Sequence, residues 1–362
     1  MKVKIIGAGS IGNHMAHASR SLDWQVDMCD IDPLALERAK YQIYPTRYGE
    51  WDQSIQLFNM HDAPTSCYDL IIIGTPPDTH VKLALEMIEE KPKGILVEKP
   101  FCTPELVALE TVLAKASKVS TQLFVGYDHV LGAAAVEFCN VLKSGVLGDL
   151  ETLDVEFREH WGGIFAAHPW LDGPFDSYLG YSRRGGGASG EHSHAINLWQ
   201  HFALAMGAGK VVDVQASMSF VDDGVVEYDK LCLLNLKTES GFLGRVVQDV
   251  VTKPSRKWAR AQGSSGYVEW HCNFKNGADK IVYSGEDNEA VEKVFEKTRP
   301  DDFIAELKHI QSAIGGQLAQ SDITVARGLE TMLVIAAAHK SAANRRSVQI
   351  DYSRGFNSQA VL

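Results

Sequence analysis

Short runs of apolar residues recur through the first third of the chain, each ending in glycine, proline or a charged residue. Segments with helical spacing separate them, at residues 11–19, 34–40 and 79–90 and from Thr103 towards Lys118. Strands that are apolar on both faces and alternate with helices are typical of a parallel sheet covered on each side. The pattern therefore predicts a doubly wound α/β domain over residues 1–127, with strands at 3–6, 25–29, 68–73, 95–97 and 122–125.

Beyond residue 127 the apolar positions begin to alternate with polar ones. This alternation predicts half-buried strands at 150–158, 211–220, 230–237, 242–251, 259–262 and 267–272. Helical spacing appears at 133–143, 301–315 and 323–343, and residues 160–187 are irregular. We expect residues 128–362 to form a second α/β domain with a large, open, mainly antiparallel sheet. Such a sheet needs covering, which favours a homo-oligomer, a dimer or a tetramer.

Length and composition narrow the possible functions. A chain of 362 residues exceeds what one hydrophobic core usually organises, so two domains are expected. The net charge of −11 argues against nucleic acid or an anionic membrane surface as a partner. The six cysteines have no CxxC spacing, which favours reduced thiols over a disulfide framework. With no secretory leader pattern and no apolar run of about 20 residues, we expect a soluble cytoplasmic protein that acts on a small molecule.

A GxGxxG motif follows the first predicted strand and opens the first predicted helix. A helix N-terminus in this context presents unpaired N–H groups to a pyrophosphate, and the middle glycine lets the backbone approach it. Asp30, at the end of the second strand, is placed to accept hydrogen bonds from the adenosine ribose, which favours NAD over NADP; Asp32 is the alternative for this role. The other interpretation is a structural glycine turn without a nucleotide. The motif predicts a Rossmann domain with cofactor contacts at Gly7, Gly9, Ser10, Ile11 and Gly12.

Two further motifs stand where strands of the predicted sheet end, the edge at which doubly wound sheets bind ligands. The segment 74–80 contributes Thr75, Pro76 and His80 as candidate cofactor contacts. A plain strand-to-helix turn with Asp78 as the N-cap explains the same residues. The second motif is Glu98-Lys99-Pro100, in which the lysine is placed to reach a substrate hydroxyl beside the nicotinamide. By itself this lysine also fits an exposed strand end.

Together, these motifs, Gly126-Tyr127-Asp128-His129 and a later glycine run followed by a histidine resemble the glucose–fructose oxidoreductase, inositol dehydrogenase and rhizopine-catabolism (Gfo/Idh/MocA) oxidoreductase family. The resemblance implies an N-terminal Rossmann domain, a C-terminal α/β domain and a substrate cleft between them. It also implies that Glu98 and Lys99 lie beside the cofactor, that Lys99 is catalytic, that Pro100 is often cis, and that Asp128 lies on the substrate side.

The resemblance places the second half of the site after the glycine run 185–187. Glu191 stands where the family usually has Asp, His194 takes the place of the catalytic histidine, and Asn197 replaces a second Asp. Residues three apart on one helix share a face, so we expect Glu191 and His194 to point the same way. A solvated helix N-terminus is the other interpretation. A metal held by His192 and His194 is disfavoured because side chains two apart on a helix diverge, and no metal is expected.

Charged and aromatic residues before the glycine run complete the candidate site. Arg183 and Arg184 fit a phosphate or carboxylate group on the substrate, although a solvated loop with a surface ion pair explains them equally well. Trp161 and Tyr181 are candidate contacts to the apolar face of a sugar ring, and packing is the alternative for both.

The sequence thus predicts an NAD(H)-dependent dehydrogenase. It would transfer a hydride between the nicotinamide and a secondary hydroxyl carbon of a sugar, cyclitol or related compound, with Lys99 or His194 exchanging the proton. Two alternatives remain. One is an enzyme that retains NAD through an elimination or a glycoside cleavage without net oxidation, and the other is a non-catalytic, ligand-sensing regulator.

Overall fold

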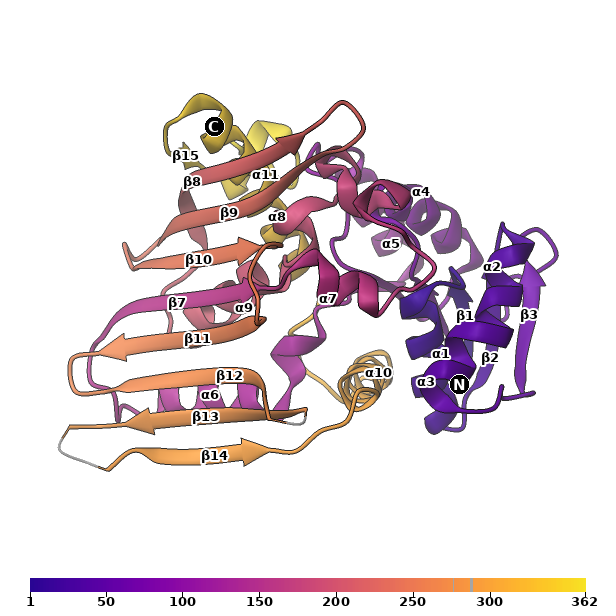
Figure 1. The fold of residues 1–362 in the computed structure, drawn as a ribbon, viewed down its shortest axis with the longest axis horizontal. Helices are drawn as coiled ribbons and strands as arrows, with labels where there is room; N and C mark the ends of the chain where they lie inside the picture. Colours follow the sequence, from indigo (N-terminus) through magenta and orange to yellow (C-terminus); the bar gives the residue numbers. More distant parts are fainter. Residues whose placement is uncertain (276, 287–288) are drawn as a thin grey trace. The chain divides into compact units, whose positions relative to one another are not determined.

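The computed structural model describes residues 1–275, 277–286 and 289–362 (Figure 1). These residues form two compact units. The first consists of Met1–Cys102, Ala108–Asp128 and Pro300–Ala326, and the second of Thr103–Val107, His129–Arg299 and Arg327–Leu362. The sequence pattern placed all of 128–362 in one domain, whereas Pro300–Ala326 packs with the first unit.

The first unit is built on a parallel sheet of six strands in the order β3-β2-β1-β4-β5-β6. The central strands β4 and β5 are buried along their whole length, which is why they appear in the sequence as uninterrupted apolar runs. The strand order reverses between β1 and β4, and ligands bind at this kind of switch point in doubly wound folds. The predicted Rossmann-type sheet is confirmed, with strands β1 Lys2–Ile6, β2 Gln25–Asp30, β3 Ile55–Asn59, β4 Leu70–Ile73, β5 Gly94–Val97 and β6 Gln122–Val125.

Helices connect these strands and cover the sheet. The helix predicted from Thr103 begins only at Leu109, because Leu106 and Ala108 adopt left-handed backbone angles (φ 58° and 60°) that interrupt a right-handed helix. A one-turn π-helix, Ala39–Ile43, leads directly into α3. The α-helices of the unit are α1 Ser10–Ser21, α2 Pro33–Arg38, α3 Tyr44–Tyr48, α4 Pro77–Met87, α5 Leu109–Val119 and α10 Asp301–Ile314.

Helix α10 returns to the first unit after the chain has built most of the second. It packs on α1, where the ring of Phe303 stacks on the ring of His14 with 4.9 Å between centroids. Farther along, the backbone N–H of Val125 in β6 donates to the carbonyl of Ile323 at 2.9 Å. These contacts are the reason that Pro300–Ala326 belongs to the first unit.

The second unit contains a sheet of nine strands in the order β14-β13-β12-β11-β7-β10-β9-β8-β15. All neighbouring strands are antiparallel except β7 and β10, which confirms the predicted mainly antiparallel sheet. The strands are β7 Leu150–Arg158, β8 Val211–Asp222, β9 Glu227–Thr238, β10 Leu243–Asp249, β11 Arg256–Gly263, β12 Tyr267–Lys275, β13 Ala278–Ser284, β14 Val291–Phe295 and β15 Val348–Gln349.

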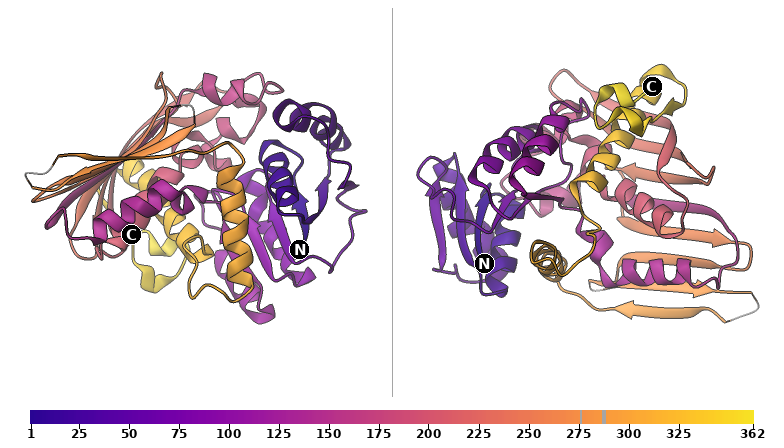
Figure 2. Two further views of the ribbon diagram at one scale, coloured as in Figure 1. Left: turned by 90° about the horizontal axis from the view of Figure 1, so that it is seen from below. Right: turned by 180° about the vertical axis from the view of Figure 1, so that it is seen from behind.

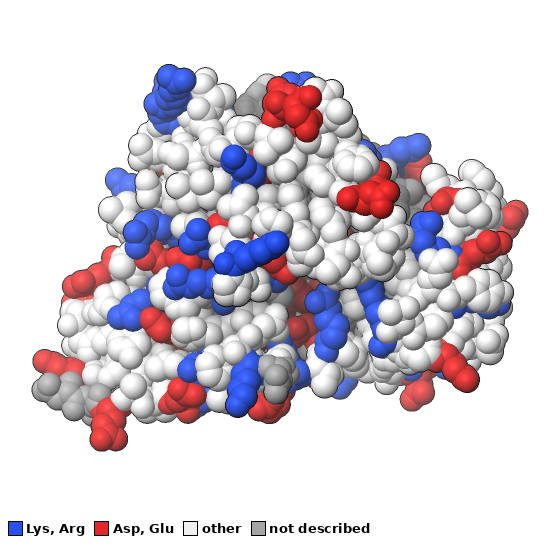
Figure 3. Space-filling model, in the orientation of Figure 1, with Lys and Arg blue, Asp and Glu red and all other residues white. Residues whose placement is uncertain are grey.

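Helices cover one face of this sheet (Figure 2). Helix α6 (Ala133–Lys143) packs on β12 and β13, and α9 (His194–Ala205) packs on β7 and β10. The opposite face carries partly exposed apolar side chains such as Leu233 and cross-strand ion pairs such as Arg260–Glu269 (2.7 Å), and the view in Figure 3 shows both signs of charge interspersed. Shorter helices are α7 Trp161–Ala166 and α8 Gly187–Glu191, and α11 is Val325–Asn344. No described helix has the length and apolar character needed to cross a lipid bilayer.

Candidate functional site

The glycine turn between β1 and α1 is shaped by steric limits at its two ends. Gly7 has a φ of +104°, and a Cβ there would lie 2.8 Å from the carbonyl oxygen of Gly74; a Cβ on Gly12 would lie 1.9 Å from the carbonyl oxygen of Gly7. At Gly9, by contrast, a Cβ would meet nothing within 4 Å. The middle glycine is therefore not required by protein packing, and it leaves open space in front of the helix N-terminus. This space fits a dinucleotide diphosphate.

The carboxylate of Asp30 lies beside this turn. Its Oδ2 accepts a hydrogen bond from the backbone N–H of Ala8 at 2.8 Å, and its Oδ1 accepts one from the N–H of Asp32 at 2.9 Å. Asp32 itself caps α2 by accepting from the N–H of Leu34. Asp30 is thus held against the glycine turn, whereas the carboxylate of Asp32 serves its own helix. The geometry favours Asp30 as the ribose-binding acid.

A basic side chain that no sequence pattern indicated lies at the same turn. Arg47, on α3, donates from Nη1 to the carbonyl oxygen of Ser10 at 3.0 Å and from Nη2 to the Ser10 hydroxyl oxygen at 2.8 Å. Ser10 is the first residue of α1 and one of the predicted cofactor contacts. The sequence pattern between residues 41 and 65 is weakly periodic, so it gave no indication that Arg47 would reach the motif.

His80 ties two of the predicted cofactor segments together. It is fully buried, with Nε2 at 2.7 Å from the carbonyl oxygen of Thr75 and Nδ1 at 3.0 Å from that of Pro100. Burial lowers the pKa of His80 to about 4, although both carbonyls act in the opposite direction. A neutral ring donates to only one of the two carbonyls. Because the ring is buried, we expect His80 to affect a cofactor by holding Thr75 and Pro100 in place. Pro76, the N-cap of α4, and Thr75 are partly exposed.

Glu98 and Lys99 follow the last residue of β5. The carboxylate of Glu98 packs against Gly126 at the end of β6, where a Cβ would come within 2.8 Å of Glu98 Oε2, and this same oxygen accepts from the backbone N–H of Lys99 at 3.3 Å. Lys99 is half-buried, and the Lys99–Pro100 peptide bond is cis, as the resemblance implied. The lysine therefore stands at the ligand-binding edge of the sheet.

A further carboxylate, which no sequence pattern indicated, is buried in the first unit. Glu306 of α10 is 1% exposed, and no described residue donates a hydrogen bond to either of its carboxylate oxygens. Burial, followed by the negative charges of Glu98, Asp128 and Asp302, raises the pKa of Glu306 well above its ordinary value. Asp128, the predicted substrate-side residue, is itself buried. The proximity of Glu306 to Glu98 and Asp128 is visible only in the structure, because helix α10 is far from them in sequence.

At the glycine run of the second unit, the space beside the glycines is occupied by other protein atoms. A Cβ on Gly186 would lie 2.1 Å from the carbonyl oxygen of Tyr178, and a Cβ on Gly187 (φ +78°) would lie 2.1 Å from Oδ1 of Asp229. Asp229 is fully buried and accepts hydrogen bonds from the Ser182 hydroxyl at 3.0 Å, from the Ser189 N–H at 2.7 Å and from the Ser189 hydroxyl at 3.1 Å. Burial raises the pKa of Asp229, although these donors and His339 oppose the shift.

Glu191 and His194 lie on two helices and not on one. Helix α8 ends at Glu191 and α9 begins at His194, so the expectation that they share one helical face was wrong. The glycines confine α8 to a single turn, and His192 and Ser193 separate the two helices. The ring of His194 stacks on that of His129, with 4.4 Å between centroids, and Glu191 accepts a hydrogen bond from the Tyr178 hydroxyl at 3.4 Å.

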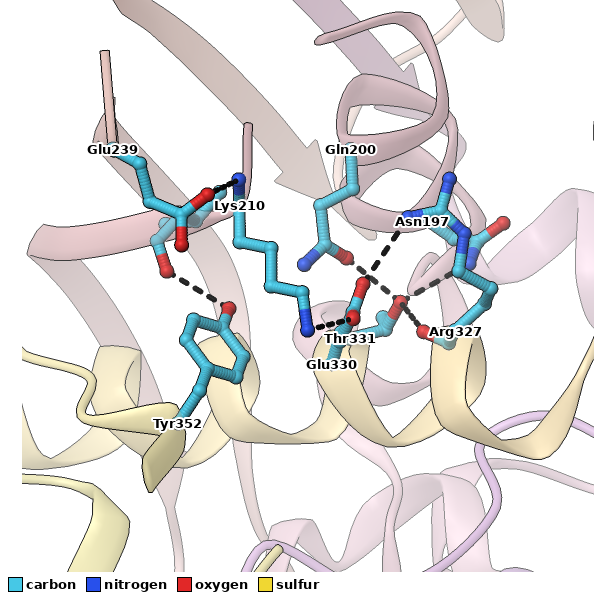
Figure 4. A network of polar contacts seen from close by, with 9 residues as sticks. Asn197, Gln200, Lys210, Glu239, Arg327, Glu330, Thr331 and Tyr352 are labelled. Atoms are coloured by element: carbon cyan, nitrogen blue, oxygen red, sulfur yellow. Dashed lines mark hydrogen bonds and ion pairs between the residues drawn. The ribbon is translucent and has the colours of Figure 1, made fainter. Parts of the chain in front are cut away.

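Asn197 lies in the contact between α9 and α11 (Figure 4). It is 5% exposed, and its amide nitrogen donates to the Thr331 hydroxyl at 3.1 Å, which in turn donates to Gln200 at 2.8 Å. The network in Figure 4 extends through Glu330 to Lys210 (2.9 Å). These bonds favour a packing role for Asn197, and a substrate contact would have to use its carbonyl oxygen or its second amide hydrogen.

The remaining candidates from the irregular segment lie around one apolar cluster, which contains Trp161 and against which Tyr181 packs. Arg183 is exposed and 3.8 Å from the exposed carboxylate of Glu227, the surface ion pair that was the alternative interpretation. The guanidinium of Arg184 lies over the ring of Tyr181, 5.8 Å from its centroid. Trp161 is 8% exposed and packs in an apolar cluster, but its indole N–H has no acceptor among the described residues. Trp161 and Tyr181 therefore have packing partners and remain candidates for ligand contact.

Residues 1–127 match the model of the GFO_IDH_MocA family, described as an oxidoreductase family with an NAD-binding Rossmann fold. A comparison of the whole sequence with curated proteins found no match. The matched residues contain the glycine turn, Asp30, His80 and Lys99. The predictions of NAD as the cofactor and of this family are confirmed by the match.

Solved structures resemble the chain over nearly its whole length. An aldose–aldose oxidoreductase from Caulobacter crescentus, crystallised with glycerol, is 18% identical with a TM-score of 0.76, and the alignment covers 97% of this chain and 99% of that one. A levoglucosan dehydrogenase in complex with NADH is 15% identical (TM-score 0.76; 96% and 98% covered). A protein from Sinorhizobium meliloti 1021 described as a putative myo-inositol dehydrogenase is 20% identical (TM-score 0.70; 96% and 99% covered). At these identities the likeness shows the fold. The match over residues 1–127 identifies this part of the chain as an NAD-binding Rossmann domain of the Gfo/Idh/MocA oxidoreductase family.

Proposed function

We propose that the protein catalyses reversible hydride transfer between nicotinamide C4 of NAD and a secondary hydroxyl carbon of a sugar, cyclitol or sugar derivative. The observation that carries the proposal is the position of Lys99. It is half-buried and directly follows β5 at the ligand-binding edge of a sheet whose glycine turn has space for a dinucleotide. Lysine at such a position is suited to exchange a proton with a reacting hydroxyl. The names of the structural neighbours, an aldose oxidoreductase and two sugar or cyclitol dehydrogenases, support the substrate class.

The residues have separate roles in this proposal. The turn with Gly7, Gly9, Ser10, Ile11 and Gly12 holds the diphosphate, Asp30 holds the adenosine ribose, and Thr75, Pro76 and Glu98 border the nicotinamide side. The bound nicotinamide supplies the hydride acceptor or donor. During oxidation the hydroxyl proton goes to the side-chain nitrogen of Lys99 or to a ring nitrogen of His194, and the carbon is left as a carbonyl. Glu191 orients the substrate or His194.

The test is a dehydrogenase screen that follows nicotinamide absorbance with sugars, inositols, uronates and nucleotide sugars, under both NAD and NADP. We expect turnover with NAD for one member of the panel. Lys99→Met and His194→Asn should each remove most of this turnover and leave NADH affinity within about twofold, because neither change touches the glycine turn. Lys115→Gln, which removes one charge from an exposed ion pair with Glu89, is the matched control and should keep the wild-type rate.

The outcomes separate the alternatives. The cofactor could co-purify, survive dialysis and release no NADH while product forms. This result would indicate a reaction that retains NAD and would contradict net oxidation. An absence of turnover across the whole panel, together with ligand binding, would indicate a regulator. Wild-type rates in both Lys99→Met and His194→Asn would overturn the assignment of these two residues.

We also propose that the protein works in the cytoplasm as a homo-oligomer. None of the six cysteines forms a disulfide bond, and burial raises the pKa of Cys29 to about 12, so this thiol stays protonated and unreactive at neutral pH. The uncovered sheet face, with Leu233 and Leu243 partly exposed, supports self-association. Sedimentation at micromolar concentration should show a dimer or a tetramer, and a monomer would contradict this assignment.

A further inference from the structure

We propose that Arg47 is a cofactor-binding residue: it holds the Ser10 hydroxyl as a hydrogen-bond donor and supplies a fixed positive charge for the diphosphate of the dinucleotide. The proposal rests on NAD binding by the first unit and does not depend on the hydroxyl substrate proposed above. Its failure would therefore leave the proposed reaction untouched.

The hydrogen-bond chemistry of the pair gives the first argument. A guanidinium has only donors, so at 2.8 Å the Ser10 Oγ must be the acceptor from Arg47 Nη2. The hydrogen of the Ser10 hydroxyl then has to point elsewhere, and in the described part of the chain it has no acceptor. Ser10 is partly exposed at the first position of α1, so this hydrogen can reach a ligand placed at the turn. Arg47 thus makes the serine a donor at the point where a phosphate binds.

Charge gives the second argument. The N-terminus of α1 is the positive end of the helix dipole, the N-cap Gly9 has no capping side chain, and the first turn contains no acidic residue. Adding a guanidinium to this end places like charges together. The neighbouring carboxylate of Asp30 accepts from the N–H groups of Ala8 and Asp32. The helix end and the guanidinium both attract an anion to the turn, and a diphosphate is such an anion.

The placement of Arg47 is built into α3. The ring of Tyr48, the next residue, stacks on His17 of α1 with 3.7 Å between centroids, and the Tyr44 hydroxyl lies 3.2 Å from His17 Nδ1. These contacts fix α3 against α1 on both sides of Arg47. The guanidinium is therefore positioned before any ligand arrives, which reduces the entropy lost on binding.

The experiment measures binding and needs no substrate. ADP-ribose is titrated by calorimetry and NADH by fluorescence into the wild type, Arg47→Gln, Arg47→Lys, Ser10→Ala and the Ser10→Ala/Arg47→Gln double variant, at low and at moderate salt. Lys40→Gln is the matched control, because it removes one charge from the adjacent π-helix, where the Lys40 ammonium lies over the ring of Tyr41 and not at Ser10. Thermal unfolding of each unliganded variant checks that the fold is retained.

We expect Arg47→Gln to weaken ADP-ribose and NADH binding by about tenfold or more and to flatten the salt dependence. Arg47→Lys should recover most of the affinity, since it keeps the charge, and Lys40→Gln should stay within twofold. In the Ser10→Ala background, Arg47→Gln should cost less than in the wild type. Two results would overturn the proposal: unchanged affinity in Arg47→Gln, or a loss in Arg47→Lys as large as in Arg47→Gln. The second would show that Arg47 only braces the turn.

Discussion

Each unit contains a glycine-rich turn at the start of a helix, and the two turns differ in what fills them. In Gly7–Gly12 the middle glycine faces open space, and the nearby polar groups, Arg47 and Asp30, are arranged around that space. In Gly185–Gly190 a Cβ at Gly186, Gly187 or Gly190 would lie about 2 Å from protein oxygens. The first turn is shaped to receive a ligand, whereas the second is packed to fix the helices that follow it. Similar glycine patterns in a sequence therefore carry two different physical requirements.

The buried acids of the two units differ in the same way. Asp229 accepts hydrogen bonds from three donors and holds the second turn. Glu306 is equally buried, but no described residue donates to it. A buried carboxylate with donors stabilises its surroundings, whereas one without donors costs free energy when it ionises. Asp229 is thus a structural acid, whereas Glu306 is an acid whose pKa is raised by burial.

The largest effect is expected at Gly187. Gly187→Ala combines a left-handed φ of +78° with a Cβ 2.1 Å from Asp229, so it should lower the free energy of unfolding by about 3 kcal/mol. Gly207→Ala is the control, because Gly207 has a φ of +79° but a Cβ there meets nothing within 4 Å, and it should cost about 1 kcal/mol. Urea unfolding measures both. Equal losses would show that packing against Asp229 is unimportant.

The next largest effect on the free energy of unfolding is expected for the removal of Asp229, whose carboxylate occupies the second turn. Asp229→Ala leaves the Ser182 hydroxyl and the Ser189 N–H without their acceptor in a buried place, at a cost of about 2 kcal/mol. Asp223, an exposed residue that accepts from the N–H groups of Val225 and Val226, provides the comparison, and Asp223→Ala should cost well under half as much. If the two variants had the same denaturant midpoint, this result would contradict the structural role of Asp229.

At the first turn the effect should appear in binding and not in stability. Gly9→Ala adds a methyl group that meets no protein atom, so the unliganded protein should change by less than about 0.5 kcal/mol. The same methyl group occupies space needed for the diphosphate, and NADH affinity should fall by roughly tenfold or more. Fluorescence titration measures the affinity, with Gly132→Ala in the second unit as a control for a glycine of ordinary φ. Wild-type NADH affinity in Gly9→Ala would place the diphosphate elsewhere.

The smallest effect concerns pH. The folded protein raises the pKa of Glu306, so above the unfolded value of about 4.3 the unfolded chain releases this proton first and stability falls as pH rises towards the folded pKa. Glu306→Gln removes the titration. Its stability relative to the wild type should therefore increase with pH, by about 1 kcal/mol between pH 5 and pH 8. Glu37→Gln, at an exposed position of α2, should show no such trend. A pH-independent difference for Glu306→Gln would show that its pKa is not raised.

Local patterns were clear for every strand of the first unit's sheet except β3, which lies in the weakly periodic segment 41–65. The apolar runs and the residues that end them predicted β4 and β5, because a fully buried strand leaves a clear mark in sequence. Helix boundaries were less certain. The helix expected from Thr103 starts at Leu109, since Leu106 and Ala108 adopt left-handed backbone angles that local propensity did not indicate. The single helix expected across Glu191 and His194 is divided into two.

The candidate site was predictable only where its chemistry lies in contiguous motifs. Gly9, Asp30 and Lys99 were named from such motifs. Arg47, Asp229 and Glu306 were missed, because each meets its partners across large separations in sequence and none stands in a recognisable pattern. The topology of the fold creates contacts of this kind, and the periodicity of apolar residues along the chain does not predict them.

The return of Pro300–Ala326 to the first unit has a consequence for how the protein is made. The edge strand β6 and the outer side of α1 acquire their covering segment only after the ribosome has synthesised the large sheet of the second unit. Until then the nascent nucleotide-binding layer has a bare edge, open to pairing with other chains or to chaperones. A shortened gene that stops after residue 127 would preserve this unfinished state, so an autonomous nucleotide-binding fragment has to be engineered with residues 300–326 grafted onto its end.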